Sequence, residues 1–329
     1  MEPAPSPSIT HLEMTWRSID ELCAPLSVEE WARPTGCPGW TVQDNVSHLI
    51  DYEATALGWP RPDHVPRHLA HTKNALGEST EVGVDHRRGR TGAEVLEEFR
   101  VVTAARRAQL QDLTEADLAG AITTPAGPGT VADMLTLRVM DTWSHEQDMR
   151  RALGRPGHEE GPAAAEAITH FARFLPYVVG RRAAAPDGAT VVLQIGALHR
   201  SVIEVRDGRA SPVGREPERA TVVLSLPPAT FAALVGGRTD APDDVVIDGD
   251  VTLGVAIVAH LASCPEHWPH GRNRVRARGG LVRSHQRAGG RLAQQGRPRH
   301  ARAGATRSSS TADPAPRTIP PTSSWTTRS

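Results

Sequence analysis

The chain has 329 residues, and 39% of them are hydrophobic, which suffices for two ordinary packed domains. Its net charge of −1 divides unevenly, because residues 266–329 hold 13 arginines and two acids and carry +11, whereas residues 1–265 carry −12. No apolar run approaches the roughly 18 residues that span a bilayer. The start lacks the basic and apolar regions of a secretory signal, so we expect a cytoplasmic protein without a membrane partner.

The cysteines exclude two further classes. Cys23, Cys37 and Cys264 are odd in number and widely spaced, and no C-x-x-C pair occurs. This usage argues against a disulfide framework and against a zinc knuckle built from cysteines. We expect the three thiols to be reduced and mostly structural.

Apolar residues recur at three- and four-residue spacings in four stretches, which predicts four amphipathic helices. These helices are expected over residues 8–23, 41–57, 91–110 and 130–153. Capping signals open the last three, and Gly154 and Pro156 end the fourth. Residues 60–90 are expected to be a long connection with at most one short helix over 65–75. Helices joined by connections without strands predict an antiparallel four-helix bundle over residues 8–156.

The pattern changes after Pro162. A helix is expected over 162–178, followed by strands with period-two alternation at 190–195, 201–205 and 220–225. Apolar stretches at 227–235 and 253–261 predict two more helices. Residues 162–264 should therefore form a small α+β domain with a mostly antiparallel sheet.

The last stretch, residues 266–329, is rich in arginine, glycine, serine and proline and has no hydrophobic period. Such a composition buries too little apolar surface to fold, so we expect a disordered basic tail. It lacks the interleaved aromatic residues of nucleic-acid-binding segments, and we expect no nucleic-acid partner. A native solvated tail and the product of a reading-frame change both fit this composition.

Ionisable residues occupy the predicted fourth helix where apolar ones are usual. Asp141 and His145 are four residues apart, roughly 40° around a helix axis, so both side chains point the same way. Such a pair is often only a surface hydrogen bond, and a buried histidine is often only structural. If the second and fourth helices face each other, however, His48 joins the pair. Three nitrogen or oxygen ligands with one open position are typical of a catalytic divalent metal, zinc first.

Other catalytic motifs are incomplete or absent in this sequence. His145-Glu146 begins like the H-E-x-x-H motif of zinc peptidases, but Met149 stands where the second histidine belongs. Cys37 precedes a helix N-terminus, where a thiol can be activated, although Cys37-Pro-Gly-Trp40 is better explained as a turn. The sequence contains neither a glycine-rich phosphate loop nor G-x-S-x-G.

Two stretches resemble the mycothiol-dependent maleylpyruvate isomerase family. They are Arg33-Pro-Thr-Gly-Cys-Pro-Gly-Trp-Thr-Val-Gln-Asp-Asn-Val-Ser-His48-Leu and Asp141-Thr-Trp-Ser-His145-Glu-Gln-Asp-Met-Arg-Arg-Ala-Leu-Gly154. The resemblance covers roughly residues 8–262 and is looser in the second half. It implies a DinB-like metal-binding bundle followed by a domain similar to sterol carrier proteins.

The resemblance also implies a chemistry. Zinc would be held by His48, His145 and Asp141, although many relatives have Glu where this chain has Asp141. Mycothiol would bind at the open position, and its metal-bound thiolate would attack a small electrophilic substrate, by isomerisation or S-transfer. Arg238 is the expected catalytic arginine, steadying substrate carboxylates. The alternative hypothesis is a non-enzymatic metal-binding or regulatory protein that keeps the bundle.

Overall fold

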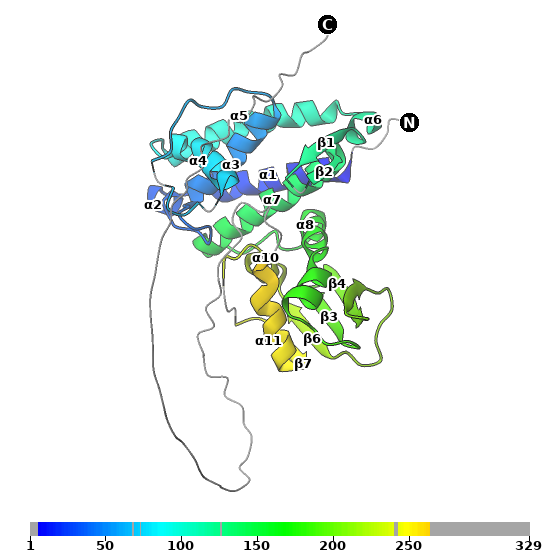
Figure 1. Ribbon diagram of the computed structural model, residues 1–329. Helices are drawn as coiled ribbons and strands as arrows, with labels where there is room; N and C mark the ends of the chain where they lie inside the picture. Colours follow the sequence, from blue (N-terminus) through cyan, green and yellow to red (C-terminus); the bar gives the residue numbers. More distant parts are fainter. Residues whose placement is uncertain (1–5, 68, 73, 126, 240–242, 264–329) are drawn as a thin grey trace, which may run out of the picture. The chain divides into compact units, whose positions relative to one another are not determined.

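The first half of the chain is helical, as expected. The computed structural model describes residues 6–67, 69–72, 74–125, 127–239 and 243–263, all within one compact unit (Figure 1). The helices of this half are α1 (Pro7–Cys23), α2 (Val28–Trp31), α3 (Val42–Ala56), α4 (Ala75–Arg87), α5 (Gly92–Gln111), α6 (Glu115–Leu118) and α7 (Val131–Leu153).

Side-chain caps begin the two helices that matter most for the site. The backbone N–H of Thr41 donates to Asp44 at 2.8 Å at the start of α3, and that of Thr130 donates to Asp133 at 2.9 Å at the start of α7. Each cap satisfies backbone donors that the first helical turn leaves open. Gly154, in the left-handed conformation at φ 65°, ends α7. These boundaries are the ones that the sequence predicts.

The long helices pack by their apolar faces. α7 contacts α1 and α3, and α5 contacts α1 and α3. Their shared core consists of fully buried side chains, the largest being Leu12, Ile19, Leu49, Ile50, Phe99, Leu110, Leu135 and Met149. Burying each of these side chains contributes about 1.5–3 kcal/mol. α3 and α7 are thereby held against each other, which positions His48 opposite Asp141 and His145.

Two expectations for this half are wrong. The segment between α3 and α5 holds the 13-residue helix α4 at Ala75–Arg87, not a short helix at 65–75. Of its buried residues, Gly77, Glu81, Gly83, Val84 and Arg87, only Val84 is a large apolar residue, so an apolar period does not reveal it. A Cβ on Gly83 would lie 2.1 Å from Asp51 Cγ, which shows how closely α4 approaches α3. The connection to α7 is also not free of strands, because β1 (Ala121–Thr124) and β2 (Gly127–Thr130) form an antiparallel hairpin.

The second half has an α+β layout, as expected. Its helical elements are α8 (Pro162–Ala172), α9 (Leu175–Tyr177), the π-helical turn η1 (Val178–Arg182), α10 (Pro228–Val235), α11 (Val251–His260) and the 3₁₀ turn η2 (Leu261–Ser263). Its strands are β3 (Thr190–Ile195), β4 (His199–Arg206), β5 (Arg209–Pro212), β6 (Val222–Leu226) and β7 (Val246–Gly249).

The sheet of this half has the order β5-β4-β3-β6-β7. Only the β3–β6 pair is parallel, so the expected mostly antiparallel sheet is confirmed. The short polar strand β5 has no alternating pattern and is not predictable from the sequence. The expected disordered tail at 266–329 lies outside the described residues.

Helix α7 belongs to the packing of both halves. It contacts α8 and α10 (Figure 1). Its Met140 and Trp143 lie in the hydrophobic core formed by the second half. The indole Nε1–H of Trp143 donates to the backbone oxygen of His158 at 2.8 Å. The helix that carries Asp141 and His145 is therefore supported from both sides.

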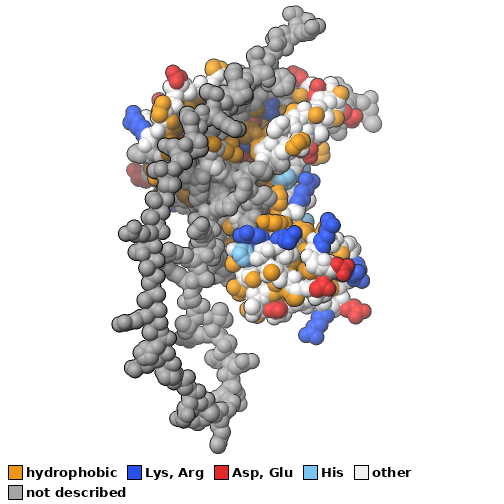
Figure 2. Space-filling model, in the orientation of Figure 1, with side chains coloured by type: hydrophobic (Ala, Val, Ile, Leu, Met, Phe, Trp, Pro, Cys, Tyr) orange, Lys and Arg blue, Asp and Glu red, His pale blue; other side chains and the backbone are white. Residues whose placement is uncertain are grey.

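The surface carries charges of both signs. On the face seen in Figure 2, acidic and basic side chains both occur over the second half, as on an ordinary solvated surface. Within the part of the chain that the structure describes, no helix combines the length and apolar character needed to cross a bilayer.

Candidate metal centre

The three predicted ligands come together. His48 Nε2 on α3 lies 3.2 Å from Asp141 Oδ2, and His145 Nε2 lies 3.4 Å from Asp141 Oδ1, both carboxylate oxygens belonging to α7. One ligand atom of each residue lies within 4.8 Å of the others. The exposed fractions are 5% for His48, 7% for Asp141 and 0% for His145, so the pair on α7 is not a surface contact. Two imidazoles and a carboxylate are a donor set that suits zinc.

A buried cation stands beside the acidic member of this set. The Arg138 guanidinium contacts Asp141 Oδ2 and also donates to Glu53 Oε1 at 2.9 Å. It lies 3.6 Å from the centre of the Tyr52 ring. Because Arg138 and His48 both approach Oδ2, Oδ1 is the carboxylate oxygen directed at His145.

The charges of the cluster shift its pKa values. Burial alone would raise the pKa of Asp141, but Arg138 and the two imidazoles outweigh it and hold that pKa well below its usual value. Burial lowers the pKa of His48, which favours the neutral ring that a metal needs. For His145, burial would lower the pKa, but the neighbouring carboxylate of Asp141 raises it well above the usual value.

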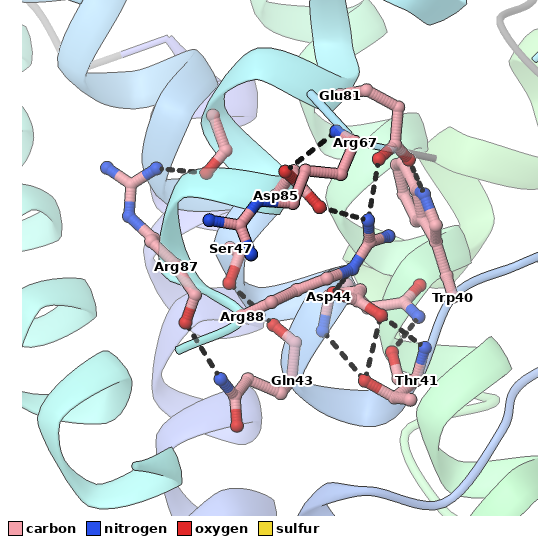
Figure 3. Close-up of polar contacts among 12 residues, drawn as sticks. Trp40, Thr41, Gln43, Asp44, Ser47, Arg67, Glu81, Asp85, Arg87 and Arg88 are labelled. Carbon is pink, nitrogen blue, oxygen red and sulfur yellow. Dashed lines mark hydrogen bonds and ion pairs between the residues drawn. The ribbon is translucent and has the colours of Figure 1, made fainter. Parts of the chain in front are cut away.

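An aromatic side chain covers the two imidazoles. The Trp40 ring centre lies 5.3 Å from that of His48 and 5.6 Å from that of His145. Its Nε1–H donates to Glu81 Oε1 on α4 at 2.5 Å, and Glu81 is fully buried (Figure 3). Arg88 Nη1 donates to Glu81 Oε2 at 3.0 Å. α4 therefore supports the site through Trp40, and sequence reasoning missed this contribution together with the helix.

Arg88 ties α4 to the start of α3. It contacts Asp44 Oδ1 at 3.0 Å and Asp85 Oδ1 at 2.9 Å (Figure 3). Asp85 also accepts from His64 at 2.7 Å and from the backbone N–H of Arg67 at 3.1 Å. Burial by itself would raise the pKa of Asp85, but these hydrogen bonds outweigh it and lower the pKa to about 2.

The lowered pKa of Asp85 predicts a pH-dependent contribution to stability. Since its folded-state pKa lies below the ordinary value, the charged carboxylate stabilises the fold above about pH 4, and this stabilisation is lost as the pH falls toward 2. An Asp85→Asn variant should have a lower free energy of unfolding than wild type at pH 6, and the difference should fall to about half at pH 3. Urea unfolding of wild type and variant at each pH measures this difference in the free energy of unfolding. An equal difference at the two pH values would contradict the prediction.

Cys37 lies at the Nδ1 side of the His145 ring, opposite the Nε2 that faces Asp141. Its Sγ–H donates to Asp148 Oδ2 at 3.1 Å, and its sulfur lies 3.7 Å from His145 Nδ1. Cys37, His145 and Asp148 also form a buried group of ligand types. Arg238 Nε donates to the same Asp148 oxygen at 3.2 Å, so a cationic side chain already pairs with the carboxylate of this second group.

Arg238, the arginine expected to bind substrate, reaches this cluster from the loop after α10. Its side chain is 2% exposed and contacts Asp148 and the backbone oxygen of Gly236. A Cβ on Gly36 would lie 2.9 Å from Arg238 Cγ, so the glycine makes room for the arginine. A crevice beside Arg238, too narrow to hold a water molecule, is lined by residues of α7, α8 and α10, including Ser144, Asp148 and Ala233. The structure thus places Arg238 near the candidate metal ligands, and its role toward substrate stays a prediction.

Helical packing in the first half brings two imidazoles and a carboxylate together, and an α+β half follows, so the fold defines a protein of mixed layout with a candidate metal centre. Comparison with known protein families identifies the family of the chain. Residues 12–150 match the mycothiol maleylpyruvate isomerase N-terminal domain, and residues 162–256 match the C-terminal domain of the same family. The chain therefore belongs to the mycothiol maleylpyruvate isomerase family.

Relatives were found among curated proteins and solved structures. Uncharacterised proteins of two Mycobacterium tuberculosis strains are 31% identical over 157 residues. The matched stretch is 46% of this chain and 58% of each relative, so the chain spans less than two thirds of their length. Crystal structures of the mycothiol-dependent maleylpyruvate isomerase and of a histidine-to-alanine mutant match with 16% identity and a TM-score of 0.45, over 74% of this chain and 93% of theirs.

Proposed function

We propose that this chain is a zinc-dependent enzyme that uses mycothiol to isomerise a small electrophilic substrate or to transfer the thiol to it. The observation that carries the proposal is the buried cluster of His48, Asp141 and His145 in a chain of this family. The name of the family supplies mycothiol as the thiol and maleylpyruvate as one candidate substrate.

The donor set fits a zinc ion. His48 and His145 supply two nitrogens and Asp141 one oxygen, which leaves a fourth position of a tetrahedral site for another ligand. Zinc held there would favour the thiolate form of mycothiol near neutral pH. We propose these three residues as the ligands.

The surrounding residues exclude water and hold the ligands in place. Trp40 covers both imidazoles, and Arg138 holds one oxygen of Asp141. A dry surrounding strengthens the electrostatic interactions within the site. Arg238 would reach a substrate carboxylate by exchanging its contact with Asp148 for a bidentate one with the substrate.

Metal content tests the first part of this proposal. After expression in zinc-supplemented medium, the purified full chain should contain about one zinc per chain, and His48→Ala should contain far less, because one of three ligands is missing. His199→Ala, on β4 of the second half, is the matched histidine control and should keep its zinc. Wild-type protein without stoichiometric zinc would contradict the proposal of a metal site.

Catalysis is tested separately from metal binding. The zinc-loaded chain should isomerise maleylpyruvate or conjugate mycothiol to an electrophile, and His145→Ala should abolish the reaction. The deep burial of the cluster beneath Trp40 also fits a second candidate, a metal-binding protein without turnover. A chain that binds zinc but leaves a panel of electrophiles unchanged in the presence of mycothiol would favour that second function.

A further inference from the structure

The orientation of one buried amide follows from its neighbours. Asn45, on α3 and 0% exposed, has its amide nitrogen 2.8 Å from the backbone oxygen of Thr41 and 3.0 Å from Thr35 Oγ1. A backbone carbonyl can only accept, so the atom facing Thr41 must be the NH₂ group. The Thr35 hydroxyl donates to the backbone oxygen of Trp40 at 3.1 Å, so its own oxygen accepts from Asn45. Both contacts orient the amide the same way.

With its NH₂ group committed, Asn45 presents its oxygen to His145. Asn45 Oδ1 lies 2.9 Å from His145 Nδ1, a hydrogen-bond distance. Since an amide oxygen can only accept, His145 Nδ1 must carry the proton. Asp148 Oδ2 lies 3.6 Å from the same nitrogen, and its negative charge also favours a proton there.

The other ring nitrogen is thereby assigned to the metal. In a neutral imidazole only one nitrogen carries a proton, so a proton on Nδ1 leaves the lone pair on Nε2. Nε2 is the atom that faces Asp141 Oδ1. A metal accepts electron density only from a nitrogen without a proton.

We infer that Asn45 is a positioning residue that sets the tautomer of His145 and makes Nε2 its metal-ligating nitrogen. The inference rests on the proposed function, because it assigns the ligand atom of that same metal site. Partners that fix the tautomer of a ligating histidine typically change metal affinity by about 10–100-fold when they are removed.

Nitrogen NMR reads the tautomer directly. The full chain, labelled with ¹⁵N-histidine and loaded with zinc, should show His145 protonated on Nδ1 in long-range ¹H–¹⁵N correlation spectra. Asn45→Leu, of similar size but without an acceptor, leaves this proton without its hydrogen bond and should bind zinc about 10–100-fold more weakly in competition with a chelator. Asn45→Asp keeps an oxygen toward Nδ1 and should restore this hydrogen bond.

A second amide on the same helix is the matched control. Gln43 donates to the backbone oxygens of Arg87 and Arg90 at 3.0 Å each, away from the metal ligands. Gln43→Leu should therefore keep the zinc affinity and the His145 tautomer of wild type, which separates the effect of Asn45 from a general loss of packing.

Two results would overturn the inference. One is wild-type protein with the His145 proton on Nε2, a spectrum that needs no variant to fold. The other is Asn45→Leu with wild-type zinc affinity. If wild type binds no zinc, the proposed function fails, whereas the spectrum of the metal-free chain, at a pH where His145 is neutral, still decides the tautomer.

Discussion

Replacing Asp141 by asparagine is expected to weaken zinc binding by at least about 100-fold, the upper end of what removing a ligand's supporting partner costs. Asp141 is the only carboxylate in the cluster with His48 and His145, so the variant removes the one negative charge that would offset a divalent ion there. The amide keeps the shape of the side chain, so the change isolates charge from packing. Titration of the metal-free chain with zinc against a chelator of known affinity measures the effect.

Two further variants make this prediction specific. Asp133→Asn removes the same charge from the same helix but at the cap of its first turn, and it should leave zinc affinity unchanged. Asp141→Glu keeps the charge and should stay within about tenfold of wild type, because Arg138 can still hold the longer carboxylate. An Asp141→Asn variant that binds zinc as tightly as wild type would remove Asp141 from the ligand set.

The second large effect is expected from Arg138→Met, which should lower the free energy of unfolding by about 3 kcal/mol, the lower end for breaking a buried ion pair. Arg138 is 2% exposed, and the variant leaves Glu53 and Asp141 buried without their shared cation. The loss stays at the lower end because Arg106 also contacts Glu53, at 3.1 Å. Urea unfolding of the metal-free chain measures it.

A double variant tests the cause of this loss. Adding Glu53→Gln to Arg138→Met removes the buried charge that was left without its partner, and it should recover part of the lost stability. If the double variant is as unstable as the sum of the two single variants, the ion pair is not the reason for the loss. A single-variant effect under about 1 kcal/mol, the range of exposed pairs, would equally contradict it.

The grouping of the three candidate ligands was largely predictable because they lie at regular positions on capped helices. The four-residue spacing of Asp141 and His145 places both on one face of α7, and Thr41 and Thr130 mark where α3 and α7 begin. His48 was expected to join them if the second and fourth helices face each other, and the resemblance to the family implies the same three residues. These signals are local, and local signals survive into the fold when the helix periods and the caps agree.

The support of the site was not predictable, since it depends on contacts between residues far apart in the chain. Trp40 contacts Glu81, forty-one residues later, on a helix in which Val84 is the only buried residue that is large and apolar, so the helix has no apolar period. Arg238 contacts Asp148, which lies 90 residues earlier in the chain, and the sequence around either residue does not predict this ion pair. Such pairs exist only once packing has excluded water from both partners.

The sequence by itself determined the helical first half and the α+β second half, because helix period, strand alternation and capping are properties of neighbouring residues. It also singled out His48, Asp141 and His145 as candidate ligands. Only the tertiary structure decided that these three side chains are buried together, that Arg138 holds one oxygen of Asp141, and that Asn45 directs its amide oxygen at His145. The physical reason is that burial and hydrogen-bond partners depend on which helices pack together. That packing is determined by apolar contacts among residues from the whole chain.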